Sequence, residues 1–92
     1  RAYCLLGDAH MELAHYQEAA EYYHRASTYK ENNFFSPQYL LKEALASEKN
    51  KNYVAAIEAC EKIIQHFYSS REFGEAKKNK ARLESILATT KK

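Results

Sequence analysis

The sequence has few of the residues that build turns, since its 92 residues include only two glycines and one proline. All-β sandwiches and barrels need a turn about every 8–12 residues, so this composition excludes that class. Tryptophan is absent, and the two cysteines, Cys4 and Cys60, form no Cys-x-x-Cys pair. We interpret both as small buried hydrophobic residues; no spacing signals a disulfide, and the redox compartment stays open.

Motifs for catalysis are also missing. The only glycines, Gly7 and Gly74, cannot form a phosphate-binding loop, and no His-Glu-x-x-His occurs. His10 and His15 are five residues apart, which would direct them to different sides of a helix, whereas zinc pairs prefer the i, i+4 spacing. We expect no enzyme, no metal site and no cofactor, and we interpret His10 as a packed imidazole.

Long apolar segments are absent as well, because no stretch approaches the roughly 20 apolar residues of a membrane span. Hydrophobic residues make up 46% of the chain and charged residues 28%, which is typical of one folded domain rather than of disorder. The chain begins with Arg1 rather than Met. We therefore expect a segment of a longer protein, whose targeting signals would lie outside this sequence.

Apolar and small residues recur at i, i+3, i+4 and i+7 along most of the chain, which predicts an all-α fold. Ser36 followed by Pro37 indicates a helix start, with the serine as cap. Only two or three residues separate the first two helices, so they must pack antiparallel, and Gly7 would let their backbones approach closely. The expected helices cover residues 2–13, 16–26, 37–48, 53–67 and 71–88.

The pattern also repeats at an offset of 37 residues. The segment 16–21 (Tyr-Gln-Glu-Ala-Ala-Glu) aligns with 53–58 (Tyr-Val-Ala-Ala-Ile-Glu), and the same offset places Gly7 on Ala44 and Tyr23 on Cys60. This self-similarity predicts two helix–turn–helix units.

The first unit resembles the tetratricopeptide repeat through Tyr3, Leu6-Gly7, Ala19, Tyr23 and Ala26, and the second through Ala44, Tyr53, Ala56, Ile57 and Ile63-Ile64. His10 replaces the family's tyrosine, Glu31 replaces the closing proline, and the second unit departs at Glu43, Ser47 and Tyr68. The resemblance implies a fragment of a right-handed α-solenoid: repeats at 1–33 and 34–68, then a capping helix at 69–92. Segment 61–70 weakly resembles bacterial envelope-associated members, which implies a periplasmic or a cytoplasmic location in a bacterium.

The resemblance further implies a non-catalytic protein–protein interaction module. The first helix of each pair would line a concave groove that suits an apolar or weakly basic helix or extended peptide. Family members with a carboxylate clamp carry Lys and Asn where this chain has Cys4 and Asp8, which argues against that ligand. An equal alternative is that the groove's Leu and Met side chains pack on neighbouring repeats, and exposed solenoid ends imply self-association. The implied partner-binding residues are Cys4, Asp8, Met11, Glu12, Gln38, Leu41, Leu45, Glu48 and Lys49.

Charge is segregated along the chain. Residues 1–70 carry a net charge of −2 and residues 71–92 a net charge of +4. The basic end suggests an alternative function, binding of nucleic acid or an anionic surface through the last helix. Acidic residues interrupt this basic segment, so we favour a solvated capping helix and do not expect a nucleic-acid partner.

Overall fold

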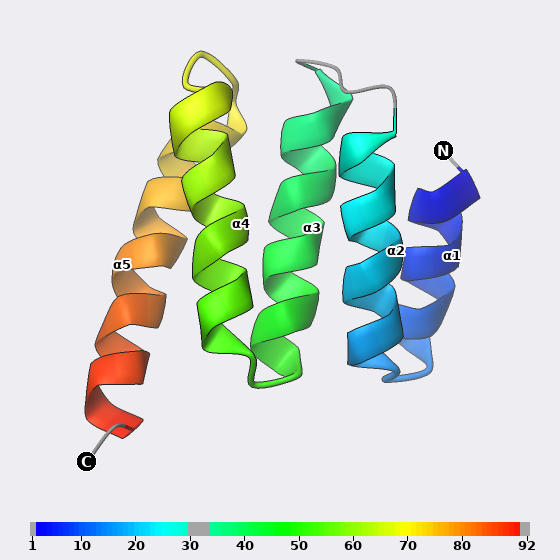
Figure 1. Cartoon of the computed structure of the whole chain (residues 1–92), viewed down its shortest axis with the longest axis horizontal. Helices are drawn as coiled ribbons and strands as arrows, with labels where there is room; N and C mark the ends of the chain where they lie inside the picture. The colour runs from blue at the N-terminus through cyan, green and yellow to red at the C-terminus, as the bar shows by residue number, and fades with distance from the viewer. Residues whose placement is uncertain (1, 30–33, 91–92) are drawn as a thin grey trace.

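The computed structural model describes residues 2–29 and 34–90 and shows an all-α protein, as predicted (Figure 1). The described part contains helices and turns but no strand. The five helices are α1 (Ala2–Glu12), α2 (Tyr16–Thr28), α3 (Phe35–Lys49), α4 (Tyr53–His66) and α5 (Glu72–Thr90).

The helices lie side by side in chain order, and each runs antiparallel to the one before it (Figure 1). This arrangement gives a slab of 40 × 32 × 15 Å, with α1 at one edge and α5 at the other. Short turns force each helix to reverse onto its predecessor, which explains the antiparallel order. Helix α3 also contacts α5, so these two helices form one face of the slab across α4.

Gly7 is buried where α1 crosses α2. A Cβ atom built at this position would lie 2.6 Å from Cε1 and 2.7 Å from Cδ1 of Tyr23. Tyr23 is itself only 2% exposed, so its ring has little room to move away. The expected role of Gly7 in close helix approach is therefore confirmed, with an aromatic side chain as the contact.

The turns after α1 and α3 have the same backbone geometry. Ala14 and Lys51 both have positive φ angles, 61° and 62°, although neither is glycine. The amide of His15 donates to the carbonyl of His10 at 2.8 Å, and the amide of Asn52 donates to that of Ser47 at 2.8 Å. Both turns are Schellman motifs, and corresponding residues in them are 37 positions apart.

The core consists of two clusters of buried side chains. The smaller cluster, between α1, α2 and α3, centres on Ala19, Tyr23 and Ala46. The larger cluster joins α3, α4 and α5 and includes Ala76 and Leu83 of α5, which are 0% and 1% exposed. Helix α5 is therefore a part of the core. Cys60 is buried and Cys4 half-buried, and both are free thiols.

The start of α3 differs from the sequence-based prediction. The helix begins at Phe35, so Ser36 lies inside it and is not the cap. Ser36 is buried, and its hydroxyl donates instead to the carbonyl of Ser27 in α2 at 2.9 Å. The prediction was wrong because Ser36 already lies within the helix and its hydroxyl donates to α2, whereas an N-cap serine precedes the helix and accepts from a backbone amide. Glu31, at the position of the closing proline, lies outside the described residues.

The contact between Gly7 and Tyr23 predicts that alanine at position 7 destabilises the fold, although helix propensity alone predicts the reverse. Alanine normally stabilises a helix by about 1 kcal/mol relative to glycine. We expect Gly7→Ala instead to lower the free energy of unfolding by about 1–2 kcal/mol, because the new methyl overlaps the Tyr23 ring. Gly74, with nothing within 4 Å of its built Cβ, is the matched control. Gly74→Ala should stabilise by about 0.5–1 kcal/mol in the same urea titration. Equal stabilisation by both would contradict the contact.

The two turns yield a second prediction. A residue with a side chain is strained in the left-handed region, so Ala14→Gly and Lys51→Gly should each stabilise the fold by about 0.5–1 kcal/mol. Ala9, exposed within α1, is the control, and Ala9→Gly should destabilise by a similar amount. Thermal unfolding measures all three variants, and a lower Tm for the turn variants would contradict left-handed backbone strain at Ala14 and Lys51.

Candidate functional site

A cavity of about 520 Å³ lies between α3 and α5. Leucines form its apolar floor, while charged and amide side chains surround them. The lining residues are Gln38, Leu41, Lys42, Ala44, Leu45, Glu48, Glu72, Glu75, Asn79, Arg82 and Leu83.

An ion pair between Glu48 and Arg82 joins α3 to α5 at this cavity. The guanidinium contacts both carboxylate oxygens, at 2.5 and 2.9 Å, which is a bidentate arrangement. The hydrogen bond from Arg82 holds the pKa of Glu48 below its ordinary value, against the effect of partial burial. The same hydrogen bond raises the pKa of Arg82. The pair therefore neutralises both groups and fixes the spacing of α3 and α5.

A second ion pair joins α1 to α3. Lys42 Nζ donates to Asp8 Oδ1 at 3.2 Å, and the same oxygen accepts from the Tyr23 hydroxyl at 2.5 Å. Burial, followed by the hydrogen bond to Asp8, raises the pKa of Tyr23. Burial by itself would lower the pKa of Lys42, but its hydrogen bond to Asp8 and the nearby Cys4 thiol raise it. Lys42 Nζ also lies 3.8 Å from Cys4 Sγ.

The two residues of each ion pair have the same separation in the sequence. Asp8 and Lys42 are 34 residues apart, and so are Glu48 and Arg82. In each pair a carboxylate on one helix meets a cation on the next odd-numbered helix. Because Lys42 also lines the cavity, the surface is continuous over α1, α3 and α5. We call this surface the α1–α3–α5 face.

The structure brings most of the nine predicted partner-binding residues to this face. Four of them line the cavity: Gln38, Leu41, Leu45 and Glu48. Cys4 and Asp8 do not line it, but both contact Lys42, which does.

Five of the nine predicted residues do not line the cavity: Cys4 and Asp8, which contact Lys42, and the three described next. Met11 packs against the buried cluster of Tyr23 and Ala46. Lys49 Nζ lies 6.0 Å from the centre of the Tyr16 ring. Glu12 is exposed in the last turn of α1.

The sequence analysis missed the contribution of α5. Glu72, Glu75, Asn79 and Arg82 line the cavity, although α5 was expected only to cap the array. A signal did exist, namely an acidic residue followed 34 positions later by a basic one. It could not be interpreted before the structure showed that α3 and α5 lie on one face.

Two acidic residues at one end of the cavity have no ion-pair partner within the described residues. Glu72 and Glu75 belong to the first turn of α5 and form no ion pair within residues 2–29 and 34–90. Gln38 and Glu72 also line an adjoining cavity with Arg71. The floor of the cavity is thus apolar, and its edge near the start of α5 carries two carboxylates.

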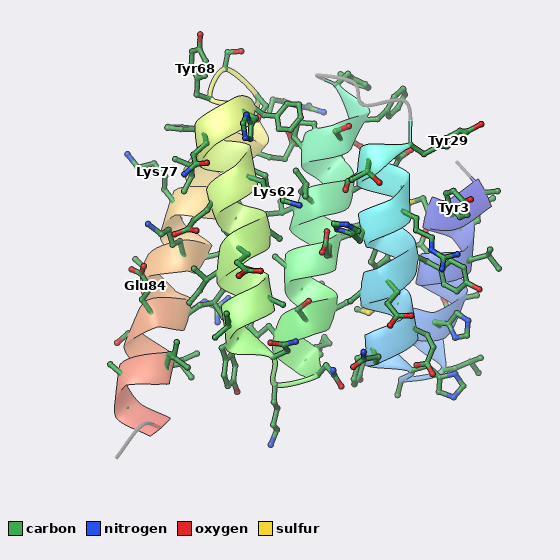
Figure 2. The ribbon with its side chains drawn as sticks, in the orientation of Figure 1. Tyr3, Tyr29, Lys62, Tyr68, Lys77 and Glu84 are labelled. Atoms are coloured by element: carbon green, nitrogen blue, oxygen red, sulfur yellow. The ribbon has the colours of Figure 1, made fainter. Side chains whose placement is uncertain are left out.

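Two of the four basic residues in α5 form ion pairs within the described residues. Lys80 lies 3.6 Å from Glu61 and 3.7 Å from Glu84, and Arg82 is held by Glu48. Lys77 projects from the outer edge of α5, with its Nζ 5.2 Å from the centre of the Phe73 ring (Figure 2). Pairing reduces the positive field that a nucleic-acid or anionic surface would require.

Another cavity, of about 320 Å³, is lined by residues of α2 and α3 and by the turn before α4, including Glu43. Burial raises the pKa of Glu43, although His24 at 3.2 Å and Lys62 act in the opposite direction. Lys62 extends from α4 toward α3 (Figure 2). The second oxygen of Glu43, Oε1, is buried and has no hydrogen-bond partner among residues 2–29 and 34–90. Glu43 and Glu48 thus have opposite pKa shifts on one helix.

The histidines of the first turn correct the sequence analysis. His10 and His15 were expected to point to different sides of a helix, but α1 ends at Glu12 and the turn brings them together. Their Nδ1 atoms are 3.2 Å apart. Across the described residues, no group of three or more His, Cys, Asp or Glu side chains is arranged to hold a metal ion.

None of the described helices is both long and apolar enough to cross a membrane. No protein-family model, curated protein or solved structure matches this chain.

Two substitutions on α3 test these charges. The folded pKa of Glu48 is lowered, so its contribution to stability is present at neutral pH and lost as the pH falls below about 4.5. We expect Glu48→Gln to destabilise by about 0.5–1 kcal/mol at pH 7, a modest value because Arg82 is half exposed. The difference from wild type should shrink in acid.

Glu43→Gln is the matched variant, and we expect it to change the free energy of unfolding in the opposite direction. Its raised pKa means that ionised Glu43 opposes folding at neutral pH, an effect removed as the pH falls through its folded and then its unfolded pKa. Glu43→Gln should therefore stabilise at pH 7 and lose that advantage in acid. Urea titrations across the acidic range measure both variants. If both variants were stabilised, or both destabilised, at pH 7, the opposite pKa shifts of Glu43 and Glu48 would be contradicted.

Proposed function

We propose that this chain is a non-catalytic binding module of the tetratricopeptide-repeat type, whose α1–α3–α5 face holds an apolar, basic peptide or partner helix. The observation that carries the proposal is the cavity between α3 and α5, with its leucine floor and acidic edge. The proposal rests on the geometry of this surface together with the family-like sequence pattern.

Repetition of structure supports the repeat interpretation. The two Schellman turns are 37 residues apart, the offset at which the sequence repeats. Burial repeats with the same offset: Gly7 and Ala44 are both buried, and so are Tyr23 and Cys60. A right-handed solenoid of two repeats with a terminal helix accounts for this regularity.

The chemistry of the cavity selects its ligand. Leu45 is 48% exposed and Leu41 half-buried, so apolar side chains of a ligand would gain contact area there. Glu72 and Glu75 would attract lysine or arginine at one end of the ligand. An amphipathic helix or an extended peptide presents both kinds of side chain along one edge.

The edge of the slab at α1 supports further association. Leu5 and Leu6 of α1 are 64% and 44% exposed, Leu13 in the turn after it is 63% exposed, and α1 lies at the edge of the slab. A preceding repeat or a second copy of the chain would bury these leucines. This contact would extend the α1–α3–α5 face and does not compete with it.

Selection from a displayed library of random short peptides tests the proposal. Wild-type protein should enrich sequences that combine leucine, isoleucine or phenylalanine with lysine or arginine. Leu45→Asp should no longer enrich these peptides, because apolar ligand side chains would have to desolvate the new carboxylate. Val54→Asp is the control, since Val54 is 53% exposed on α4, away from the cavity. Leu41→Asp is less suitable because Leu41 packs on the core.

Three results would contradict the proposal: the same peptides retained by Leu45→Asp, enrichment of acidic peptides, or no enrichment at all. Binding should also depend weakly on salt. If single-stranded DNA or anionic vesicles bound instead, with steep salt dependence and loss on charge reversal of Lys77 and Lys78, the last helix would be the binding element.

A further inference from the structure

The turn after α1 holds two histidine side chains side by side. The His15 amide donates to the His10 carbonyl at 2.8 Å, and the Ala14 amide donates to the Met11 carbonyl at 3.0 Å. This pair of hydrogen bonds defines a Schellman motif, in which the first and last residues place their side chains in contact. That contact is usually between apolar groups, but here it is between two imidazoles.

The two rings are oriented by their surroundings. His10 is half-buried and stacks on Tyr22 of α2, with ring centres 5.4 Å apart and planes at 11°. The planes of His10 and His15 meet at 39°, and their Nδ1 atoms are 3.2 Å apart. The Tyr22 ring therefore orients His10, and the backbone of the turn places His15 against it before any ligand binds.

The nitrogen separation fits a pair of metal ligands. Imidazole nitrogens bind zinc at about 2.0–2.1 Å. Two nitrogens 3.2 Å apart then subtend about 100° at the ion. This angle lies between that of neighbouring ligands in an octahedron and that in a tetrahedron, so the nitrogen separation suits two ligands of one divalent transition-metal ion.

Histidine at position 15 does not cap the helix that it precedes. His15 is the N-cap residue of α2, and its side chain makes no capping hydrogen bond. The corresponding residue 37 positions later, Asn52, caps α4 by accepting from the Ala55 amide at 3.3 Å. A histidine here forgoes about 1 kcal/mol of capping stabilisation. Departure from a local rule without a structural gain is typical of functional positions.

We propose that His10 and His15 form a two-imidazole site for a divalent transition-metal ion of the Zn²⁺, Ni²⁺ or Cu²⁺ class, with water in the remaining positions. The one hydrogen between the facing Nδ1 atoms would move through solvent to an Nε2, which leaves both Nδ1 lone pairs free for the ion. This site is independent of the α1–α3–α5 face.

Calorimetric titration of the protein with Zn²⁺ and with Ni²⁺, together with thermal unfolding, tests the site. Wild-type protein should bind either ion, its Tm should rise with ion concentration, and EDTA should reverse the rise. Mg²⁺ should cause no shift, because it prefers oxygen ligands. Absence of binding by both transition metals would overturn the proposal.

His15→Asn is the most informative variant. Asparagine should cap α2 as Asn52 caps α4, so metal-free His15→Asn should have a higher Tm than wild type while its metal-dependent shift is lost. His10→Phe keeps a ring to stack on Tyr22 and should also lose the shift. Loss of binding in a variant that is more stable cannot come from unfolding.

His66→Asn and Cys4→Ser are the controls, because His66 is exposed at the end of α4 and Cys4 is a free thiol. Both should keep the wild-type metal affinity. The proposal is overturned if His15→Asn and His10→Phe bind as well as wild type, or if a control variant loses binding to the same extent.

Discussion

The packing of Tyr23 is the interaction on which the first three helices depend. Its ring fills the space that the missing Cβ of Gly7 leaves, and its hydroxyl donates to Asp8, which in turn accepts from Lys42. One side chain of α2 thereby fixes the distance to α1 and the orientation of an ion pair between α1 and α3. The apolar contact and the polar contact support each other, because a ring held at this depth can only present its hydroxyl at the surface where Asp8 lies.

The same principle operates farther along the chain with different residues. Cys60 occupies the position that corresponds to Tyr23, and Ala44 the position of Gly7, so this crossing has a small side chain from each helix. Cys60 has no hydroxyl with which to orient a carboxylate as Tyr23 does. The bidentate contact between Glu48 and Arg82 instead joins α3 to α5, beside a core that Ala76 and Leu83 complete. An apolar cavity with an acidic edge results between these two helices.

The first turn contains two positions that break local rules. Ala14 has a positive φ angle, and His15 stands at an N-cap that it does not cap. The second turn shares the backbone strain at Lys51 but has a capping asparagine. The two turns therefore differ in side-chain chemistry while they share a fold. The backbone of the turn therefore does not require a histidine at position 15, since Asn52 occupies the corresponding position in the second turn.

The sequence by itself determined the all-α class, the approximate helix boundaries and the close approach at Gly7, because 3.6-residue periodicity and a glycine within a helix are local signals. Four of the predicted partner-binding residues on α3 also line one cavity. Only the tertiary structure decided that α5 completes that cavity, that Ser36 bonds to α2, and that His10 meets His15. These contacts depend on where a helix ends and on which helices share a face, and neither is encoded in the periodicity of a single segment.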